Sequence, residues 1–306
     1  MTVATPPVAG RGRRRWSRRD VLLAGAGVMG VAGLAGSGTA AYAVGVEPVD
    51  LTVTKYRLSP PGWPAGRKLT IAVVADLHAG GPNMGVAQIR SVVDQTNALG
   101  ADVIAVLGDY FATHRFITEP VPHPVWAAEL ARLAAPLGVF AILGNHDWWH
   151  DVDGVRAALA AERIRLLEND AVLIGSGRER VWIAGIADQI AIRLGPRRYR
   201  GMDDLPGTLA KVTTPDPVVL LVHEPDIFPK VPDRVALTLA GHTHGGQIRI
   251  PLLWEHFVPS IYGARYAYGH IVETNRHMIV SGGLGTSWVP ARLGVPPEVV
   301  LVELSS

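Results

Sequence analysis

Residues 241–247 of the chain read GHTHGGQ, with two histidines one residue apart and glycines on both sides. In an extended segment, side chains at positions i and i+2 point to the same side, so His242 and His244 could reach one point. The neutral imidazole is the commonest metal ligand in proteins, and glycine allows a backbone to approach a bound group closely. Taken alone, this segment is more typical of a polar turn between strands, so the rest of the chain has to decide.

Five short apolar runs each end at a side chain that can bind metal. The runs span 70–75, 102–108, 139–144, 217–222 and 235–241, and the residues that follow them are Asp76, Asp109, Asn145, His223 and His242. Continuous apolar runs of this length suit strands buried on both faces. Ligands of open α/β sheets bind beyond the carboxyl ends of the strands, so we expect these five side chains to meet at one site.

Helical segments separate these runs. Residues 86–99, 125–133 and 155–162 have helical patterns, and strands that alternate with helices predict an α/β architecture. Upstream, residues 44–68 are rich in proline and glycine and are expected to form a connector with one strand at 51–56. Residues 69–306 are then expected to form a single domain.

The composition limits the chemistry of the site. The chain of 306 residues is 48% hydrophobic and 18% charged, which fits a packed globular protein. It has no cysteine, so disulfides, thiolate ligands and a cysteine nucleophile are excluded, and any metal has to be held by nitrogen and oxygen. Residues 1–43 carry six arginines and one aspartate, whereas the whole chain has a net charge of only +2. The rest of the chain is therefore mildly acidic, and no nucleic-acid partner is expected.

Residues 1–43 have the three parts of an export signal. An arginine-rich start precedes a charge-free run at 21–43, which is dominated by Gly and Ala and ends in the small-residue sequence AYA. The pair Arg18-Arg19, followed by Asp, Val and Leu, resembles a twin-arginine signal. We therefore expect the twin-arginine translocase to export the folded chain to the cell envelope or the extracellular space. An uncleaved membrane anchor and a basic tail are the alternatives.

The metal-capable residues belong to five ordered motifs. These motifs are Asp76-Leu77-His78, Gly108-Asp109-Tyr110, Gly144-Asn145-His146-Asp147, Val222-His223-Glu224 and Gly241-His242-Thr243-His244. In this order they resemble the calcineurin-like metallophosphoesterase superfamily, whose pattern is D-x-H, G-D, G-N-H-D/E, H and G-H-x-H. The resemblance covers roughly residues 70–303. The stretches GHTHGGQ, GLGTS and LGVPPEVVLVEL, together with the twin-arginine start, look like the YkuE-like branch of exported bacterial phosphoesterases.

The resemblance implies a fold and a metal site. The fold would be α/β (α+β), a four-layer αββα sandwich of two mixed β-sheets flanked by helices. The site would hold two divalent ions, for which histidine and carboxylate ligands suit Mn, Fe or Zn. The implied ligands are Asp76, His78 and His244 for one metal and Asn145, His223 and His242 for the other, with Asp109 as the bridge. A metal-bridging hydroxide would attack phosphorus. His146 would stabilise the transition state and help to protonate the leaving oxygen.

Further residues near these motifs have two interpretations each. Asp147 is expected either to orient a histidine through a hydrogen bond or to cap the helix that follows. The aromatic residues Tyr110, Trp148 and Trp149 would line a substrate pocket or pack in the core. Residues 193–200, with four arginines in an expected loop, would bind a second phosphate or lie in solvent, and Arg292 would bind phosphate or be structural. The protein-phosphatase sequence DRG is missing after the G-D motif, which argues against a phosphoprotein phosphatase of that branch.

The resemblance and the export signal together predict a phosphoester hydrolase that acts outside the cytoplasmic membrane. A phosphodiester or pyrophosphate bond in a lipid- or wall-linked molecule fits that location. The enzymatic alternatives are a secreted phosphomonoesterase or nucleotidase and a lipid enzyme similar to UDP-2,3-diacylglucosamine pyrophosphohydrolase. A non-catalytic surface module with a structural metal is the alternative from another class, but structural sites have no need of an acid such as His146.

Overall fold

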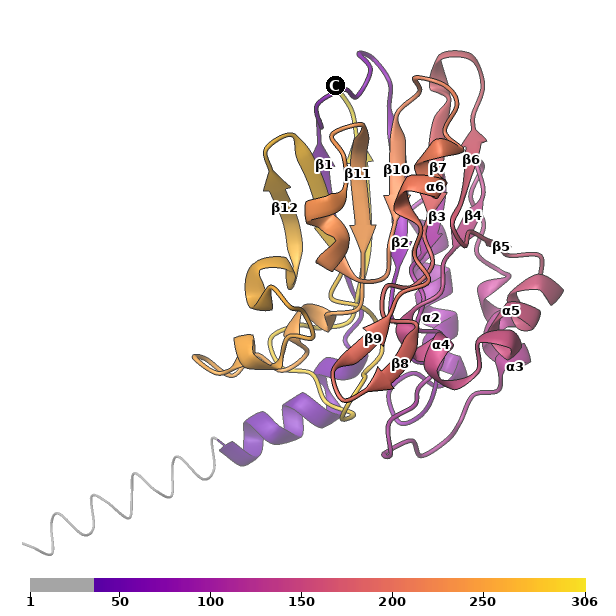
Figure 1. Ribbon diagram of the computed structural model, residues 1–306. Coiled ribbons are helices and arrows are strands. Elements are labelled where there is room, and N and C mark those ends of the chain that lie inside the picture. The colour runs from indigo at the N-terminus through magenta and orange to yellow at the C-terminus, as the bar shows by residue number, and fades with distance from the viewer. Residues whose placement is uncertain (1–35) are drawn as a thin grey trace, which may run out of the picture. The chain divides into compact units, whose positions relative to one another are not determined.

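The computed structural model describes residues 36–306 (Figure 1). The Arg18-Arg19 pair lies outside the described residues, so the export signal stays a prediction. The chain divides into two units, Met1–Tyr42 and Ala43–Ser306, and all described strands belong to the second. Residues 36–45 are helical. Within the described part of the chain, no helix combines the length and the apolar character that crossing a membrane requires.

The first large sheet has six strands in the order β1-β14-β2-β3-β4-β5. Its strands are β1 (Thr52–Leu58), β2 (Leu69–Val74), β3 (Val103–Val106), β4 (Val139–Ala141), β5 (Arg165–Leu166) and β14 (Glu298–Leu304). Strands β2 to β5 are parallel, and β14 is antiparallel to β2 but parallel to β1. Because β1 pairs with β14 along its whole length, residues 44–68 supply an edge strand of the sheet as well as a connection.

The second large sheet also has six strands, in the order β12-β13-β11-β10-β7-β6. Its strands are β6 (Asp170–Ile174), β7 (Val181–Gly185), β10 (Val218–Leu221), β11 (Val235–Ala240), β12 (Gly269–Glu273) and β13 (Arg276–Val280). The four inner strands are parallel, and the two edge strands run antiparallel to them. A separate two-stranded hairpin, β8 (Ile192–Gly195) and β9 (Arg198–Arg200), occupies the segment that was expected to be an arginine-rich loop.

Helices cover the outer faces of the two sheets. The α-helices are α2 (Val86–Ala98), α3 (His123–Leu130), α4 (Asn145–His150), α5 (Val152–Ala161) and α6 (Leu205–Ala210). The 3-10 turns are η1 (Glu47–Val49), η2 (Gly177–Glu179), η3 (Pro225–Lys230), η4 (His244–Gly246), η5 (Trp254–Phe257) and η6 (Gly263–Tyr266). The three helices predicted from sequence correspond to α2, α3 and α5; α2 matches its predicted bounds almost completely, whereas α3 and α5 begin a few residues earlier than predicted.

Three apolar clusters define the layers. One cluster packs Ile89, Trp126 and Leu159 of α2, α3 and α5 on the outer face of the first sheet. The middle cluster lies between the sheets and joins side chains such as Val73 and Leu239. The third cluster covers the outer face of the second sheet with α6 and η3. This arrangement confirms the predicted four-layer sandwich of two mixed sheets, although short elements form most of the fourth layer.

Each of the five apolar runs forms a strand, as predicted. The runs correspond to β2, β3, β4, β10 and β11, three from the first sheet and two from the second. The strands of both sheets that carry these runs point their carboxyl ends to the same end of the sandwich, where α4 and the β8–β9 hairpin lie (Figure 1). Side chains that are far apart in the sequence therefore meet between the two sheets at this end.

Candidate metal centre

The predicted ligands meet at the carboxyl ends of the strands and are almost completely removed from solvent. Asp76, His78, Asp109, Asn145, His223 and His244 are buried, and His242 is partly buried. Each of them lies within about four residues of the end of β2, β3, β4, β10 or β11, and Asn145 is the first residue of α4. Burying several carboxyl and imidazole groups together is costly unless they are paired or bind a cation, which makes this cluster a candidate metal centre.

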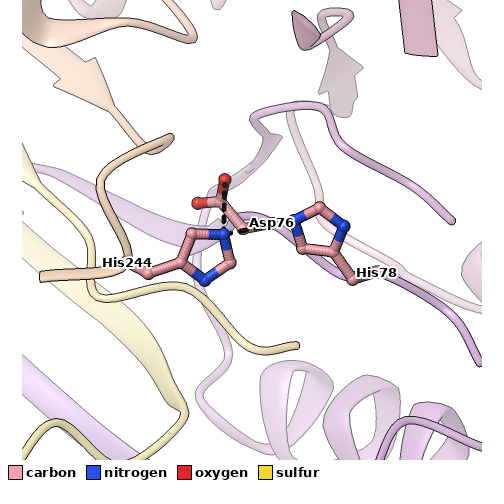
Figure 2. Close-up of side chains that lie close together, drawn as sticks. All are labelled: Asp76, His78 and His244. Atoms are coloured by element: carbon pink, nitrogen blue, oxygen red, sulfur yellow. Dashed lines mark hydrogen bonds and ion pairs between the residues drawn. The ribbon is translucent and has the colours of Figure 1, made fainter. Parts of the chain in front are cut away.

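Asp76, His78 and His244 form the first group of ligand atoms. The Nε2 atoms of His78 and His244 lie 3.1 Å apart, and the two rings are stacked with centroids 5.0 Å apart. The Asp76 Oδ1 atom lies 3.7 Å from His244 Nε2. Figure 2 shows the three side chains converging beside the Asp76 carboxyl group. Donor atoms of all three residues lie close enough to one another to share one ion.

Asn145, His223 and His242 form the second group. The Asn145 Oδ1 atom lies 3.1 Å from His223 Nε2 and 2.8 Å from His242 Nδ1. The other ring nitrogens face backbone carbonyls, because His223 Nδ1 lies 2.7 Å from the Leu107 oxygen and His242 Nε2 lies 3.0 Å from the Pro259 oxygen. A ring nitrogen that donates to a carbonyl leaves the opposite nitrogen free as a ligand, so each imidazole is oriented toward Asn145.

Asp109 lies between the two groups. Its Oδ2 atom is 3.5 Å from His78 Nε2 in the first group and 3.3 Å from His223 Nε2 in the second. Its Oδ1 atom accepts a hydrogen bond of 2.8 Å from the backbone N–H of His146. One carboxyl group thus reaches both sets of donor atoms, which is the position that a bridging ligand needs.

The two histidines of GHTHGGQ reach these groups by a different route from the expected one. The segment is not extended, because His242 and His244 have φ angles of 69° and 50°, with Thr243 in the right-handed helical region between them. The argument from i and i+2 spacing in an extended chain was therefore wrong. The turn directs His242 toward Asn145 and His244 toward His78, so the rings serve different groups.

Left-handed backbone conformations are concentrated at this site. Five of the seven predicted ligands have positive φ angles: Asp76, His78, Asp109, His242 and His244. Such conformations cost on the order of 1–3 kcal/mol each for residues other than glycine and persist only where the surrounding structure enforces them. Their concentration in ligand-bearing turns indicates that the fold gives up some stability to place these side chains.

Two glycines leave room for the ligands. A Cβ atom on Gly144 would lie 2.5 Å from His223 Cε1, and one on Gly241 would lie 2.6 Å from Asp76 Oδ2. Both distances are below normal contact, so any side chain at either position would displace a predicted ligand. This close approach explains why glycine precedes both Asn145 and His242.

Burial and mutual charge shift the pKa values of the cluster in opposite directions. Burial raises the pKa of Asp76 to about 7 and lowers the pKa of His78 to about 3. Burial also lowers the pKa of His244 well below its usual value. Burial alone would raise the pKa of Asp109, but His223, His146 and His78 hold it well below its usual range. Burial alone would lower the pKa of His223, but Asp109, Glu224 and Asp76 raise it well above its usual value, so a cation bound there has to displace a proton from this ring. Imidazole and carboxylate groups are donors that divalent cations of intermediate softness accept, so the residues fit such metals.

His146 lies at the edge of this cluster and lines a cavity of about 950 Å³. Its Nδ1 atom is 2.5 Å from Thr113 Oγ1, and its Nε2 atom is 3.3 Å from Ser287 Oγ. Burial lowers the pKa of His146 to about 4. The sequence interpretation did not assign Thr113 or Ser287, although Ser287 ends the GLGTS motif. Thr113 belongs to none of the motifs, and only the fold places it beside His146.

Asp147 binds backbone rather than a histidine. Its carboxyl group accepts hydrogen bonds from the N–H groups of Gly144, Asp109 and Tyr110, at 2.8, 2.9 and 2.9 Å. The capping interpretation is therefore the correct one, and it extends beyond α4. By holding the turn at residues 109–110 as well, Asp147 sets the direction of the Asp109 side chain.

Three other candidates pack inside the protein. Tyr110 is fully buried, stacks on Trp126 and donates its hydroxyl to the Ile142 carbonyl, so it is not a pocket residue. Trp148 packs against the helical core cluster. Arg292 is fully buried and donates to the carbonyls of Gly282, Gly285 and Val295, while its Nη2 lies 3.3 Å from His244 Nδ1. Trp148 and Arg292 are missing from the described residues that line the cavity, so a phosphate-binding role for Arg292 does not fit its position.

The cavity at the candidate centre has walls that the motifs did not predict. Trp149 lines it, as one interpretation proposed, and so do Arg193 and Arg197 of the hairpin segment. Glu224 also lines it and lies close enough to His223 and His242 to share an ion with them. Glu224 follows His223 in the fourth motif, but the sequence interpretation assigned it no role.

Comparison with known proteins places this geometry in a family. Residues 69–246 match the family model described as calcineurin-like phosphoesterase. An uncharacterized metallophosphoesterase of Aquifex aeolicus is 30% identical over 85% of this chain and 94% of its own length. The uncharacterized metallophosphoesterase YkuE of Bacillus subtilis is 28% identical over 96% of this chain and 99% of its own length. The phosphodiesterase YaeI of Escherichia coli is 29% identical over 70% of this chain and 76% of its own length.

Proposed function

The chain belongs to the calcineurin-like phosphoesterase family, and from this premise we propose that it is a two-metal phosphodiesterase acting outside the cytoplasmic membrane. The position of Asp109, within 3.5 Å of His78 and 3.3 Å of His223, carries the two-metal part of this proposal. A carboxylate placed between two separate sets of donor atoms has the position that a ligand shared by two ions needs. The relative named as a phosphodiesterase supports the preference for diesters.

The residues divide into two ligand sets. Asp76, His78 and His244 would hold one ion; Asn145, His223 and His242 would hold the other; and Asp109 would contact both. Divalent ions bound there would supply Lewis-acid attraction for the phosphoryl oxygens and an acidic water as the nucleophile. Two cations a few Å apart repel each other, so the Asp109 charge between them makes joint occupancy favourable.

His146 would act on the substrate rather than on a metal. Its ring lines the cavity, and its centroid lies 5.0 Å from that of His78, so it can reach a phosphoryl group held by the ligand set. Thr113 Oγ1 holds the Nδ1 atom at 2.5 Å, whereas the Nε2 atom has only a contact of 3.3 Å to Ser287 Oγ and is the nitrogen that would face the substrate. A ring N–H directed at the leaving oxygen would stabilise the charge that develops there and supply its proton.

The proposal is tested with the full-length chain. Elemental analysis is expected to find about two transition-metal ions per chain, and Mn²⁺ is expected to support hydrolysis of bis-p-nitrophenyl phosphate more than hydrolysis of p-nitrophenyl phosphate. Chelation is expected to abolish turnover and to lower Tm by about 10 °C, since a ligand far above its Kd stabilises a protein by roughly 4 kcal/mol. Re-addition of Mn²⁺ has to restore both. Stoichiometric metal without any turnover would instead favour a binding module.

The location outside the membrane has its own test. Changing Arg18→Lys together with Arg19→Lys is expected to keep the protein in the cytoplasm, because twin-arginine export depends on the arginine pair. Cell fractionation with an antibody to the chain measures the distribution. Changing Arg13→Lys and Arg14→Lys gives a control with the same loss of arginines outside the pair. Export of the first variant at the level of the control would contradict the twin-arginine assignment.

A further inference from the structure

One wall of the cavity at the metal centre is apolar. Part of the segment 248–262 forms this wall together with residues near the end of the GLGTS motif. The apolar side chains that line the cavity here are Ile248, Ile250, Phe257, Val258, Ile261, Trp288 and Val289. The same cavity reaches Asp109, Asn145 and His146, so apolar and ligand-bearing walls belong to one continuous space.

The outer part of this wall is open to solvent. Ile261 is 84% exposed, Trp288 57%, Phe257 50% and Ile250 43%. Single exposed apolar side chains are common on protein surfaces, but several that surround one cavity mark an interaction site. The wall therefore has the character of a binding surface rather than of a core.

Hydrogen bonds connect this wall to the metal ligands. The Pro259 carbonyl oxygen lies 3.0 Å from Nε2 of His242. Two residues further, the Ile261 N–H donates to Asp226 Oδ2 at 2.8 Å, and Ser260 Oγ lies 2.5 Å from Asp226 Oδ1. These contacts fix the backbone of residues 259–261 beside His242, and Ile261 lines the same cavity as the predicted ligands Asp109 and Asn145.

Another part of the cavity lining is aromatic and cationic. The Tyr199 ring stacks on Trp149 with centroids 5.7 Å apart, and the Arg193 guanidinium lies 3.5 Å from the Trp149 ring centroid. Arg197 lines the same side of the cavity. Positive charge on this side suits an anionic phosphoester, whereas the wall of residues 248–262 suits a hydrocarbon group.

From these walls we infer that the substrate is an amphiphile, a phosphodiester in which one ester group carries a long apolar chain that lies against Ile250, Phe257, Ile261 and Trp288. This inference rests on the proposed function. In the reaction, water adds to phosphorus, one P–O ester bond breaks, and the leaving alkoxide takes a proton. The products are a phosphomonoester and an alcohol, with no oxidant or reductant required.

The experiment compares two esters that differ only in chain length. Methyl p-nitrophenyl phosphate and decyl p-nitrophenyl phosphate are hydrolysed by the Mn²⁺-loaded full-length chain, at concentrations below micelle formation. Release of p-nitrophenolate gives kcat/KM for each ester. We expect the decyl ester to exceed the methyl ester by about tenfold or more, because burying each additional methylene group increases affinity roughly fourfold.

Variants of the wall locate the effect. Ile261→Ser and Phe257→Ser are each expected to reduce the decyl-to-methyl ratio about threefold or more, and taking the ratio within each variant cancels any change in folding or in the chemical step. Leu252→Ser is the matched control. Leu252 lies in the same segment and is 94% exposed, but it is not among the described residues that line the cavity. Its ratio is expected to equal that of the unmodified chain.

The outcomes separate this inference from the proposed function. Equal kcat/KM values for the two esters in the unmodified chain, or ratios unaffected by Ile261→Ser and Phe257→Ser, overturn the inference. Binding of the unmodified chain to phosphatidylcholine vesicles without any chain-length preference also overturns it, since the wall would then contact a membrane surface. If no ester is hydrolysed, the proposed function fails, and calorimetric binding of decyl phosphate against methyl phosphate tests the apolar wall without turnover.

Discussion

Replacing Asp109 by asparagine is expected to remove metal and activity together. The Asp109→Asn change keeps the size of the side chain and the oxygen that accepts the His146 N–H, but it removes the negative charge between His78 and His223. Without that charge, two neighbouring cations repel each other with little compensation. We expect at most one ion per chain by elemental analysis and a decrease in kcat/KM of roughly 10³-fold, equivalent to about 4 kcal/mol.

The comparison for Asp109→Asn is a carboxylate far from the site. Asp153 lies on α5 with its side chain 90% exposed, so Asp153→Asn changes the net charge equally without reaching the ligands. This control is expected to bind two ions and to hydrolyse bis-p-nitrophenyl phosphate at the normal rate. Two ions and near-normal turnover in Asp109→Asn would show that Asp109 does not bridge, and the two-metal assignment would have to be abandoned.

Replacing His146 by alanine is expected to separate metal binding from catalysis. The side chain is not among the predicted ligands, and its ring nitrogens face Thr113 and Ser287. His146→Ala should therefore retain two ions per chain and a normal Tm. A missing general acid typically lowers turnover by about 10²–10⁴-fold, and we expect kcat for bis-p-nitrophenyl phosphate to fall within that range.

A neighbouring histidine provides the control for His146→Ala. His150 lies one helical turn further along α4, and its ring stacks on that of His146 with centroids 6.0 Å apart. His150 is exposed and is not among the described residues that line the cavity. His150→Ala should therefore change kcat by less than about threefold. If His146→Ala keeps its full rate, the acid is another group. If it loses metal as well, His146 supports the ligand set instead.

The inner strands that carry the candidate ligands could be predicted from the sequence, for a simple physical reason. Strands buried on both faces have to be apolar throughout, so the runs that became β2, β3, β4, β10 and β11 stand out from their surroundings. A strand was also predicted at 51–56, where β1 lies, but its pairing was not, because its partner β14 lies almost 250 residues away and nothing local indicates the pairing. The β8–β9 hairpin was expected to be a loop, since its arginines resemble a solvated segment.

The residues of the candidate centre were predicted better than their conformations. The resemblance of the motifs to one family identified Asp76, His78, Asp109 and His244, because such motifs record which side chains a site needs. Spacing did not indicate the left-handed turns that aim His242 and His244 in different directions. For Arg292 the sequence left phosphate binding and a structural role open, and its guanidinium donates to three carbonyls inside the protein.

The sequence by itself determined the type of chemistry: nitrogen and oxygen donors without any thiolate, placed after apolar strands in an order typical of one family. Only the tertiary structure decided how those donors combine, because distances between segments far apart in the chain depend on how two sheets pack. It brought Asp109 between His78 and His223, joined Thr113 to His146, and left an apolar wall beside the ligands. The sequence defines which side chains are present, whereas the tertiary structure sets the distances between them.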